Sequence, residues 1–135
     1  QMSAQLRFSD VDNFGHVNNA VYFTLFDSCK ARYFMEIIGQ DALEHISYVV
    51  ANVNADFLAP VFYPDEIAIQ TKITKLGNKS FTMVQRAINT RTGEVKCDCQ
   101  EIMVAFDKHT NSAVALPDEY KRKIAAYEKD IDFGL

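Results

Sequence analysis

The sequence predicts an α+β fold: a five-stranded antiparallel sheet wrapped around one long helix, followed by a short C-terminal helix. An apolar stretch of helical length runs from Asn19 to Ile38, and four later segments alternate polar and apolar residues with the period of a strand. A helix that is apolar on most sides must be covered by other elements, so we expect the sheet to curl around it. A length of 135 residues suits one domain, which we expect to cover residues 1–135.

The N-terminal part is expected to form a strand and then a polar loop. Polar and apolar residues alternate from Ala4 to Phe8, and the segment from Asp10 to Asn18 follows. Gly15 gives this loop a permissive backbone. Asn18 or Asn19 is suited to cap the helix that begins there.

The long helix is expected from Asn19 to Ile38. Its first half is apolar nearly all round, and its second half becomes amphipathic. Gly39 is a good residue to follow the last turn. The segment from Asp41 to His45 is expected to add one more helical turn.

Four strands are expected after the helix, over residues 48–59, 66–76, 81–89 and 95–107. Pro60 ends the first of them, and Gly77-Asn78 is a turn signal. On the first strand, one apolar face is expected to comprise Val49, Ala51, Val53, Ala55, Phe57 and Ala59. Residues 108–115 look irregular. Pro117 and two acidic residues then open a short helix that reaches about Glu128.

Composition excludes several classes of function. A net charge of −4 argues against a nucleic-acid partner held by phosphate neutralisation. No apolar run has membrane-spanning length and no secretory signal is visible, so we expect no membrane partner. Cys29, Cys97 and Cys99 lack the spacing of a zinc site and are interpreted as reduced thiols that pack as small hydrophobes. We therefore expect a cytoplasmic protein without a metal.

The stretch from Asp10 to Tyr22 concentrates the residues that can do chemistry. It contains two carboxylates, a histidine, two adjacent asparagines and a glycine directly before the apolar helix. A helix N-terminus carries unpaired N–H groups and a partial positive charge. It therefore suits the stabilisation of an oxyanion.

This stretch also resembles a known family. The string Asp10-x-Asp12-x-x-Gly15-His16-Val17-Asn18-Asn19-x-x-Tyr22, a long helix and four strands are similar to the hotdog-fold acyl-CoA thioesterases of the 4-hydroxybenzoyl-CoA thioesterase type. The order of elements matches from about Ser3 to Tyr127. The resemblance implies a thioester hydrolase that releases a free acid and coenzyme A. It implies no cofactor apart from the coenzyme A of the substrate.

The resemblance also implies roles for individual residues. Asp12 matches the catalytic carboxylate, which acts as nucleophile or as general base for water. The backbone N–H at Asn19 matches the oxyanion donor, and His16 belongs to the same catalytic string. Lys79 and Ser80 match a region that meets the phosphates of coenzyme A, often across a subunit boundary. The related acyl-ACP thioesterases carry an asparagine where this chain has Phe14, which puts their asparagine-assisted mechanism in doubt here.

Other interpretations of these residues remain open at this point. Asp12 could cap the loop or pair with Arg7, and Asp10 is expected to be structural. His16 could orient the loop, contact substrate or satisfy a buried carbonyl. Lys79 could be a solvated charge on a turn. Tyr22 and Phe26 are candidates for the lining of an acyl cleft.

Partners and a second class of function follow from the same fold. The exposed edges and far face of such a sheet favour a homodimer or a tetramer formed by two dimers. The alternative function is a non-catalytic module that binds acyl thioesters. The sequence leaves open the acyl group, the oligomer size and the choice between coenzyme A and acyl-carrier-protein thioesters.

Overall fold

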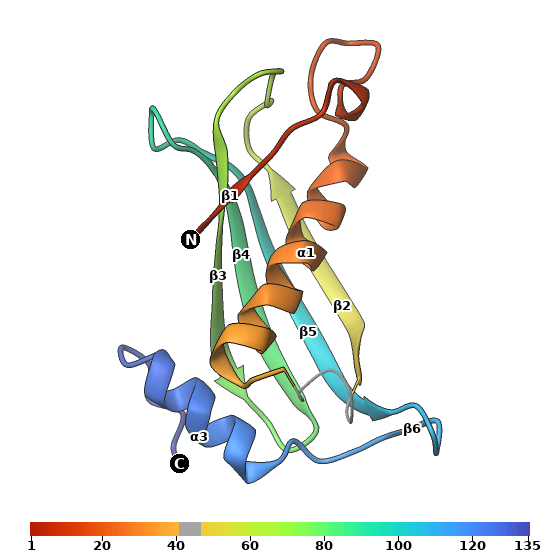
Figure 1. Cartoon of the computed structure of the whole chain (residues 1–135), viewed down its shortest axis with the longest axis vertical. Coiled ribbons are helices and arrows are strands. Elements are labelled where there is room, and N and C mark those ends of the chain that lie inside the picture. The colour runs from red at the N-terminus through yellow and green to blue at the C-terminus, as the bar shows by residue number, and fades with distance from the viewer. Residues whose placement is uncertain (41–46) are drawn as a thin grey trace.

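The computed structural model describes residues 1–40 and 47–135 and confirms the α+β architecture (Figure 1). Helix α1 (Asn19–Ile37) lies across one face of a single antiparallel sheet, and helix α3 (Asp118–Tyr127) lies near the C-terminal end of α1. The order of strands across the sheet is β1 (Met2–Ala4), β3 (Ile67–Leu76), β4 (Ser80–Asn89), β5 (Val95–Asp107) and β2 (Ser47–Phe57).

Both ends of α1 lie close to their predicted positions. The Asn18 side chain caps the start by accepting a hydrogen bond from the Ala20 N–H at 2.9 Å. At the other end, the Gly39 N–H donates to the Phe34 carbonyl at 3.1 Å, and Gly39 has a φ of +123°. The further turn predicted from Asp41 to His45 lies outside the described residues.

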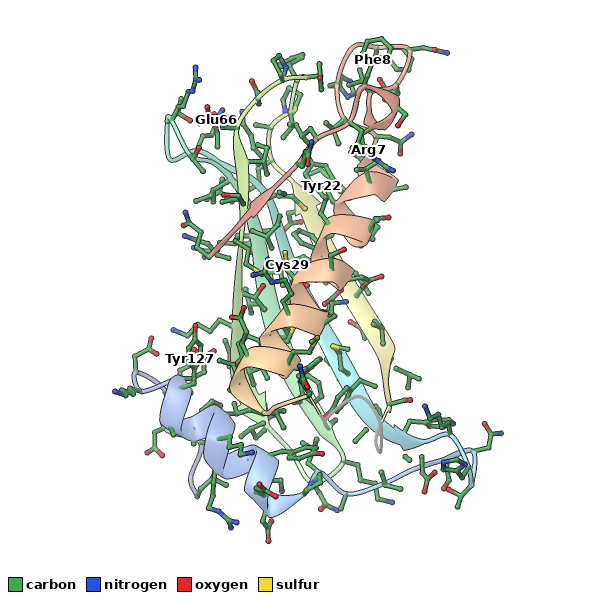
Figure 2. All side chains as sticks on the ribbon, viewed as in Figure 1. Arg7, Phe8, Tyr22, Cys29, Glu66 and Tyr127 are labelled. Atoms are coloured by element: carbon green, nitrogen blue, oxygen red, sulfur yellow. The ribbon has the colours of Figure 1, made fainter. Side chains whose placement is uncertain are left out.

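The core lies between α1 and the sheet. The fully buried side chains there include Phe26, Ile69, Ile73, Phe81 and Met83. Tyr22 and Cys29 project from α1 into the same layer (Figure 2). The three cysteines are free and buried, as predicted. Burial raises the pKa of the Cys97 thiol to about 11, so this thiol is protonated and poorly nucleophilic at neutral pH.

The predicted position of the first strand was wrong. β1 covers Met2–Ala4, and Phe8–Asp10 forms a 3₁₀ turn, η1, instead of the end of a strand. Phe8 is 81% exposed, so the alternation from Ala4 to Phe8 does not reflect burial against the sheet. The Asp10 carboxylate holds the turn by accepting the backbone N–H of Arg7 at 2.8 Å.

The predicted inward face of β2 was half wrong. A bulge between Val50 and Asn52 shifts the register against β5. The inward residues are therefore Tyr48 and Val50 before the bulge, with Val53, Ala55 and Phe57 after it. β2 is also more exposed than predicted, because it is an edge strand.

The C-terminal part contains one strand that the sequence did not predict. Within the stretch interpreted as irregular, β6 (Ser112–Ala113) pairs with the end of β5. α3 follows Pro117 and is anchored by Glu128, whose Oε2 accepts the Tyr33 hydroxyl at 3.2 Å and the Ile73 N–H at 2.8 Å. Burial, followed by the Glu128 charge, raises the pKa of Tyr33. The Tyr33 hydroxyl therefore keeps its proton and can donate.

Candidate functional site

The loop before α1 closes on itself around Asp12. The Asp12 N–H donates to the His16 carbonyl at 2.9 Å, and the Gly15 N–H donates to the Asp12 carbonyl at 3.1 Å. Gly15 has a φ of +85°, a conformation that glycine adopts without steric cost. Asp12 Oδ1 accepts the Phe14 N–H at 2.9 Å. This bond orients the carboxylate. The other oxygen, Oδ2, accepts no hydrogen bond from the described residues, and the Asp12 side chain is 24% exposed.

Asp10 fixes the base of the loop and does not face the site. Its side chain is 3% exposed and pairs with the Arg7 guanidinium, with Oδ1 2.9 Å from Nη2. Burial alone would raise the pKa of Asp10, but the hydrogen bonds from Arg7 outweigh it and lower the pKa. The Asp10 carbonyl also accepts the Asn18 N–H at 3.0 Å. Arg7 thus pairs with Asp10, and the expected structural role of Asp10 is confirmed.

The loop is fastened to the connection between β2 and β3. The Val17 N–H donates to the Val61 carbonyl at 2.7 Å, and His16 forms an isolated bridge with Phe62. Val17 and Val61 are both buried, at 2% and 1% exposure. These contacts hold the catalytic candidates against the top of the sheet in Figure 1.

His16 lies beside Asp12 without a direct hydrogen bond to it. Its Nδ1 is 3.7 Å from Asp12 Oδ2, which is beyond hydrogen-bonding distance. The imidazole stacks on Phe14 with 6.2 Å between ring centroids and meets the edge of Phe62 at 6.5 Å. His16 is therefore held in place by aromatic contacts next to the carboxylate.

The first turn of α1 offers one free donor to the site. The Ala20 N–H is taken by the Asn18 side chain, and the Val21 N–H donates to the Asn18 carbonyl at 3.0 Å. The Asn19 N–H meets no acceptor anywhere in residues 1–40 or 47–135. An unpaired N–H at a helix N-terminus is a ready binding point for negative charge.

A small cavity of about 210 Å³ opens beside this helix end. Its lining comprises His16, Val17, Asn19, Tyr22, Phe57, Leu58, Ala59 and Pro60. Tyr22 packs against Phe57 with 5.6 Å between ring centroids, and burial, followed by a smaller contribution from Cys97, raises the pKa of Tyr22 to about 12. Phe26, which was also a candidate for the lining, is 0% exposed and lies in the core.

Lys79 and Ser80 lie at the opposite end of the sheet from Asp12. Lys79 belongs to the turn between β3 and β4, and Ser80 begins β4. Figure 1 shows this turn near α3, whereas the loop before α1 is at the other end of the view. The Lys79 carbonyl accepts the Ala105 N–H at 2.9 Å. One chain therefore brings together Asp12, His16 and Asn19 but keeps Lys79 apart from them.

Sequence reasoning missed one buried polar pair on the inner side of α1. Lys30 Nζ is 2.8 Å from Glu101 Oε1, and the two residues are 5% and 2% exposed. The helical pattern alone assigns Lys30 to the polar face of the helix. The signal lay in β5, where Glu101 takes the place of an apolar residue between Cys99 and Met103 on the inward face.

Two negative findings hold for the described part of the chain. No cluster of three or more His, Cys, Asp or Glu side chains is placed to bind a metal there. Neither of its helices combines the length and hydropathy of a membrane span.

Comparison with known proteins places this geometry in a family. The model of the thioesterase-like superfamily matches residues 6–124. The chain is 30% identical over 119 residues to the uncharacterised protein YsmA of Bacillus subtilis, covering 88% of this chain and 80% of the relative. It is 27% identical over 135 residues to the long-chain acyl-CoA thioesterase FadM of Escherichia coli, covering 92% and 96% of the two chains.

Solved structures agree with these matches. The crystal structure of a thioesterase from Thermus thermophilus, complexed with coenzyme A and zinc, has a TM-score of 0.83 and 30% identity, covering 94% of this chain and 92% of the other. The PA5185 protein of Pseudomonas aeruginosa has a TM-score of 0.85 and 26% identity, covering 97% and 92%. The matches support the thioesterase hotdog fold without singling out the 4-hydroxybenzoyl-CoA type.

Proposed function

The chain belongs to the thioesterase-like superfamily and is a thioester hydrolase, and from that premise we propose that it hydrolyses an acyl-CoA thioester at Asp12. The observation that carries this proposal is that His16 lies beside the Asp12 carboxylate and lines the same cavity as Asn19. A carboxylate and an oxyanion donor are the two groups that acyl transfer from a thioester needs.

The reaction then follows from these positions. The thioester carbonyl lies in the cavity with its oxygen toward the Asn19 N–H. In the general-base route, Asp12 takes a proton from water while the water oxygen bonds to the carbonyl carbon. The helix N-terminus stabilises the resulting oxyanion. Collapse of the intermediate breaks the carbon–sulfur bond. Asp12 returns the proton it took from water to the sulfur, and coenzyme A leaves as a free thiol.

The alternative route uses Asp12 as the nucleophile. Oδ2 then attacks the carbonyl carbon, the thiolate leaves, and water cleaves the resulting anhydride. The bond from the Phe14 N–H to Oδ1 orients the carboxylate in both routes. In ¹⁸O-labelled water under single-turnover conditions, unlabelled acid together with label in Asp12 identifies the alternative route, because water has then cleaved the anhydride at the Asp12 carbon and the Asp12 oxygen has left with the product.

A second subunit is part of the proposal. Lys79 is too far from Asp12 within one chain to bind the phosphates of the same coenzyme A, so the Lys79 that serves a site must come from a second copy. The edge strand β2 supports such an assembly, since only β5 pairs with it among the described residues. Val49, on the outward face of β2, is also 43% exposed.

Release of free thiol from a panel of acyl-CoA esters tests the proposed function. We expect turnover with at least one aliphatic or aromatic ester. Asp12→Asn should lower kcat by about a thousandfold, the scale of a lost general base. Its melting temperature should not change, because asparagine keeps an oxygen for the Phe14 N–H.

Asp107→Asn is the matched control. Asp107 Oδ1 accepts the His109 N–H at 2.8 Å, so this substitution changes a carboxylate with the same local bond at the end of β5. Wild-type kcat in Asp12→Asn would remove Asp12 from the mechanism. Binding of acyl-CoA esters without thiol release across the panel would instead favour a non-catalytic binding module.

A further inference from the structure

α1 leaves part of the inner face of β2 uncovered. We call this uncovered strip, together with the α1 side chains that border it, the groove. Val50, Val53 and Phe57 are 42–43% exposed. Directly opposite residues of an antiparallel pair project to the same face. Their partners on β5 are 0–4% exposed: Met103, Glu101 and Cys97. The inner face of β5 thus lies under α1, whereas the inner face of β2 lies open beside the helix.

The groove has a hollow at each end. The upper hollow is the 210 Å³ cavity at Asn19, Tyr22 and Phe57. The lower hollow measures about 410 Å³, and its lining includes Lys30 and Val50. Residues three or four apart lie on one face of a helix, so the residues of α1 that border the groove form a row: Asn19, Tyr22, Phe23, Asp27 and Lys30.

The length of the groove sets the size of what it can hold. Lys30 follows Asn19 by eleven residues, which is about 16 Å along a helix axis. An extended hydrocarbon advances about 1.3 Å per carbon at ordinary carbon–carbon bond lengths. A chain that starts with its carbonyl at Asn19 therefore reaches Lys30 after roughly twelve carbons.

The far end of this groove is polar. Lys30 Nζ donates to Asp27 Oδ1 at 2.9 Å and to Glu101 Oε1 at 2.8 Å. An ammonium has three N–H donors, so one is left over. Asp27 is 71% exposed at its side chain, and only its Oδ1 is engaged among the described residues. A spare donor and a spare acceptor therefore lie side by side.

The charges here select the kind of group that fits. Two carboxylates surround one ammonium, so the local charge is negative and a carboxylate ligand is repelled. Burial alone would lower the pKa of Lys30, but its bonds to Glu101 and Asp27 outweigh burial and raise it. The ammonium is thus charged at neutral pH. A methyl group would displace water from these ions without replacing its hydrogen bonds.

We propose that the groove binds the acyl chain of the substrate, and that Lys30 and Asp27 recognise a hydroxyl group about twelve carbons from the thioester carbonyl. A hydroxyl both accepts and donates, so it can take the spare N–H of Lys30 and give its own proton to Asp27. The substrate class is a hydroxylated long-chain acyl thioester. This inference rests on the proposed function, which supplies the position of the carbonyl.

Two matched thioesters test the inference: dodecanoyl-CoA and its ω-hydroxylated form. We expect the wild-type protein to show about fivefold higher kcat/KM for the hydroxylated chain, the ratio that one net hydrogen bond gives. The two free acids, measured by calorimetry, should differ in affinity in the same direction. Calorimetry does not depend on turnover.

Two variants remove the recognising groups. Lys30→Met with Glu101→Met replaces the buried ion pair by apolar side chains, which avoids leaving one charge unpaired. Asp27→Ala keeps the Lys30–Glu101 pair and removes only an exposed acceptor. Both should bring the ratio close to one. The matched control is Arg32→Met with Glu36→Met, which removes an exposed ion pair on the same helix and should keep the ratio.

The outcomes separate this inference from the proposed function. Release of thiol from both esters at equal rates, with equal affinities for the two acids, would overturn hydroxyl recognition and leave the hydrolase intact. No thiol release from any ester, with the hydroxylated acid still preferred, would overturn the proposed reaction and keep the groove. A preference that persists in both Lys30 and Asp27 variants also overturns the inference.

Discussion

Asp10 and Asp12 are separated by one residue, but their surroundings give them different tasks. Asp10 is buried and receives hydrogen bonds from the side chain and backbone of Arg7. Asp12 keeps one carboxylate oxygen without a hydrogen bond from residues 1–40 or 47–135, beside His16. A carboxylate saturated with donors stabilises a structure, whereas one with a free oxygen can react.

The role of Asp10 can be tested by its pH dependence. Its folded pKa lies below the unfolded value, so its contribution to stability is present above that unfolded value, near pH 4, and is lost as pH falls through the folded pKa. Asp10→Asn should lower the free energy of unfolding by about 1–2 kcal/mol at pH 7. Urea unfolding measured from pH 7 to pH 3 should show this difference shrinking toward acid.

An unchanging difference between the two proteins across that range would show that Asp10 acts through packing instead of charge. Asp118→Asn is a suitable control, because Asp118 is a carboxylate in the first turn of α3, away from the loop. Its effect on unfolding should be a few tenths of a kcal/mol.

At the scale of elements, the N-terminus of α1 combines a structural cap with the proposed oxyanion site. Asn18 satisfies the second N–H of the helix, and Asn19, whose N–H has no acceptor among the described residues, belongs to the lining of the cavity. The cap fixes the direction of the free N–H, because it holds the first turn in place. We therefore expect a loss of the cap to affect both stability and the proposed oxyanion binding.

Removal of the cap should affect both properties. Asn18→Ala should lower the free energy of unfolding by about 1 kcal/mol and the melting temperature by about 3–5 °C. Asn18→Ser, which restores an oxygen acceptor, should recover most of the loss. Thermal melts and thiol release on the same samples measure the two effects together.

Asn13→Ala serves as the control, since Asn13 is an exposed loop residue with no side-chain bond recorded in the described ranges. A cap variant with normal melting but reduced turnover would mean that Asn18 acts on substrate directly. If Asn18→Ala has the wild-type melting temperature and the wild-type turnover, the Asn18 cap contributes to neither property.

At the scale of the whole molecule, the candidate site is divided between the two ends of the sheet. Asp12 and the free N–H lie at one end, and Lys79 lies at the other. A two-fold axis that pairs the β2 edges of two copies would bring opposite ends together, because paired antiparallel strands run in opposite directions. The proposed phosphate site therefore requires a second copy of the chain.

Mixed oligomers test this division. Lys79→Ala should raise KM for acyl-CoA esters more than for short pantetheine esters, which lack the nucleotide phosphates. When Lys79→Ala chains are mixed with Asp12→Asn chains, some oligomers contain one chain of each kind. In these oligomers, the site with an intact Asp12 lies on the Lys79→Ala chain and receives Lys79 from the Asp12→Asn chain. We therefore expect the mixed oligomers to contain active sites with wild-type KM. The two kinds of chain carry different tags, so that the mixed oligomers can be isolated before KM is measured.

If KM in the mixed oligomers stays at the Lys79→Ala value, Lys79 either serves the Asp12 of its own chain or does not belong to the site. Light scattering must first give a mass of at least two chains of 15.3 kDa each, since the experiment requires an oligomer. Equal effects of Lys79→Ala on both classes of ester would exclude the phosphate role.

The sequence by itself determined the elements and the reactive stretch. Periodicity predicted α1, β3 and β5 almost to the residue, because these elements are buried on one face and their patterns record that burial. The string from Asp10 to Asn19 predicted the loop, the cap and the catalytic candidates, because turns and caps depend on local residue chemistry.

Only the tertiary structure decided the features that depend on contacts between residues far apart in the sequence. The bulge after Val50 reversed the faces of part of β2, and Arg7 paired with Asp10. The buried Lys30–Glu101 pair joins residues 71 positions apart, which no local pattern records. The separation of Lys79 from Asp12 likewise follows from how the strands cross the sheet. A sequence pattern reports burial and turn chemistry, whereas distances between remote side chains exist only once the chain has folded.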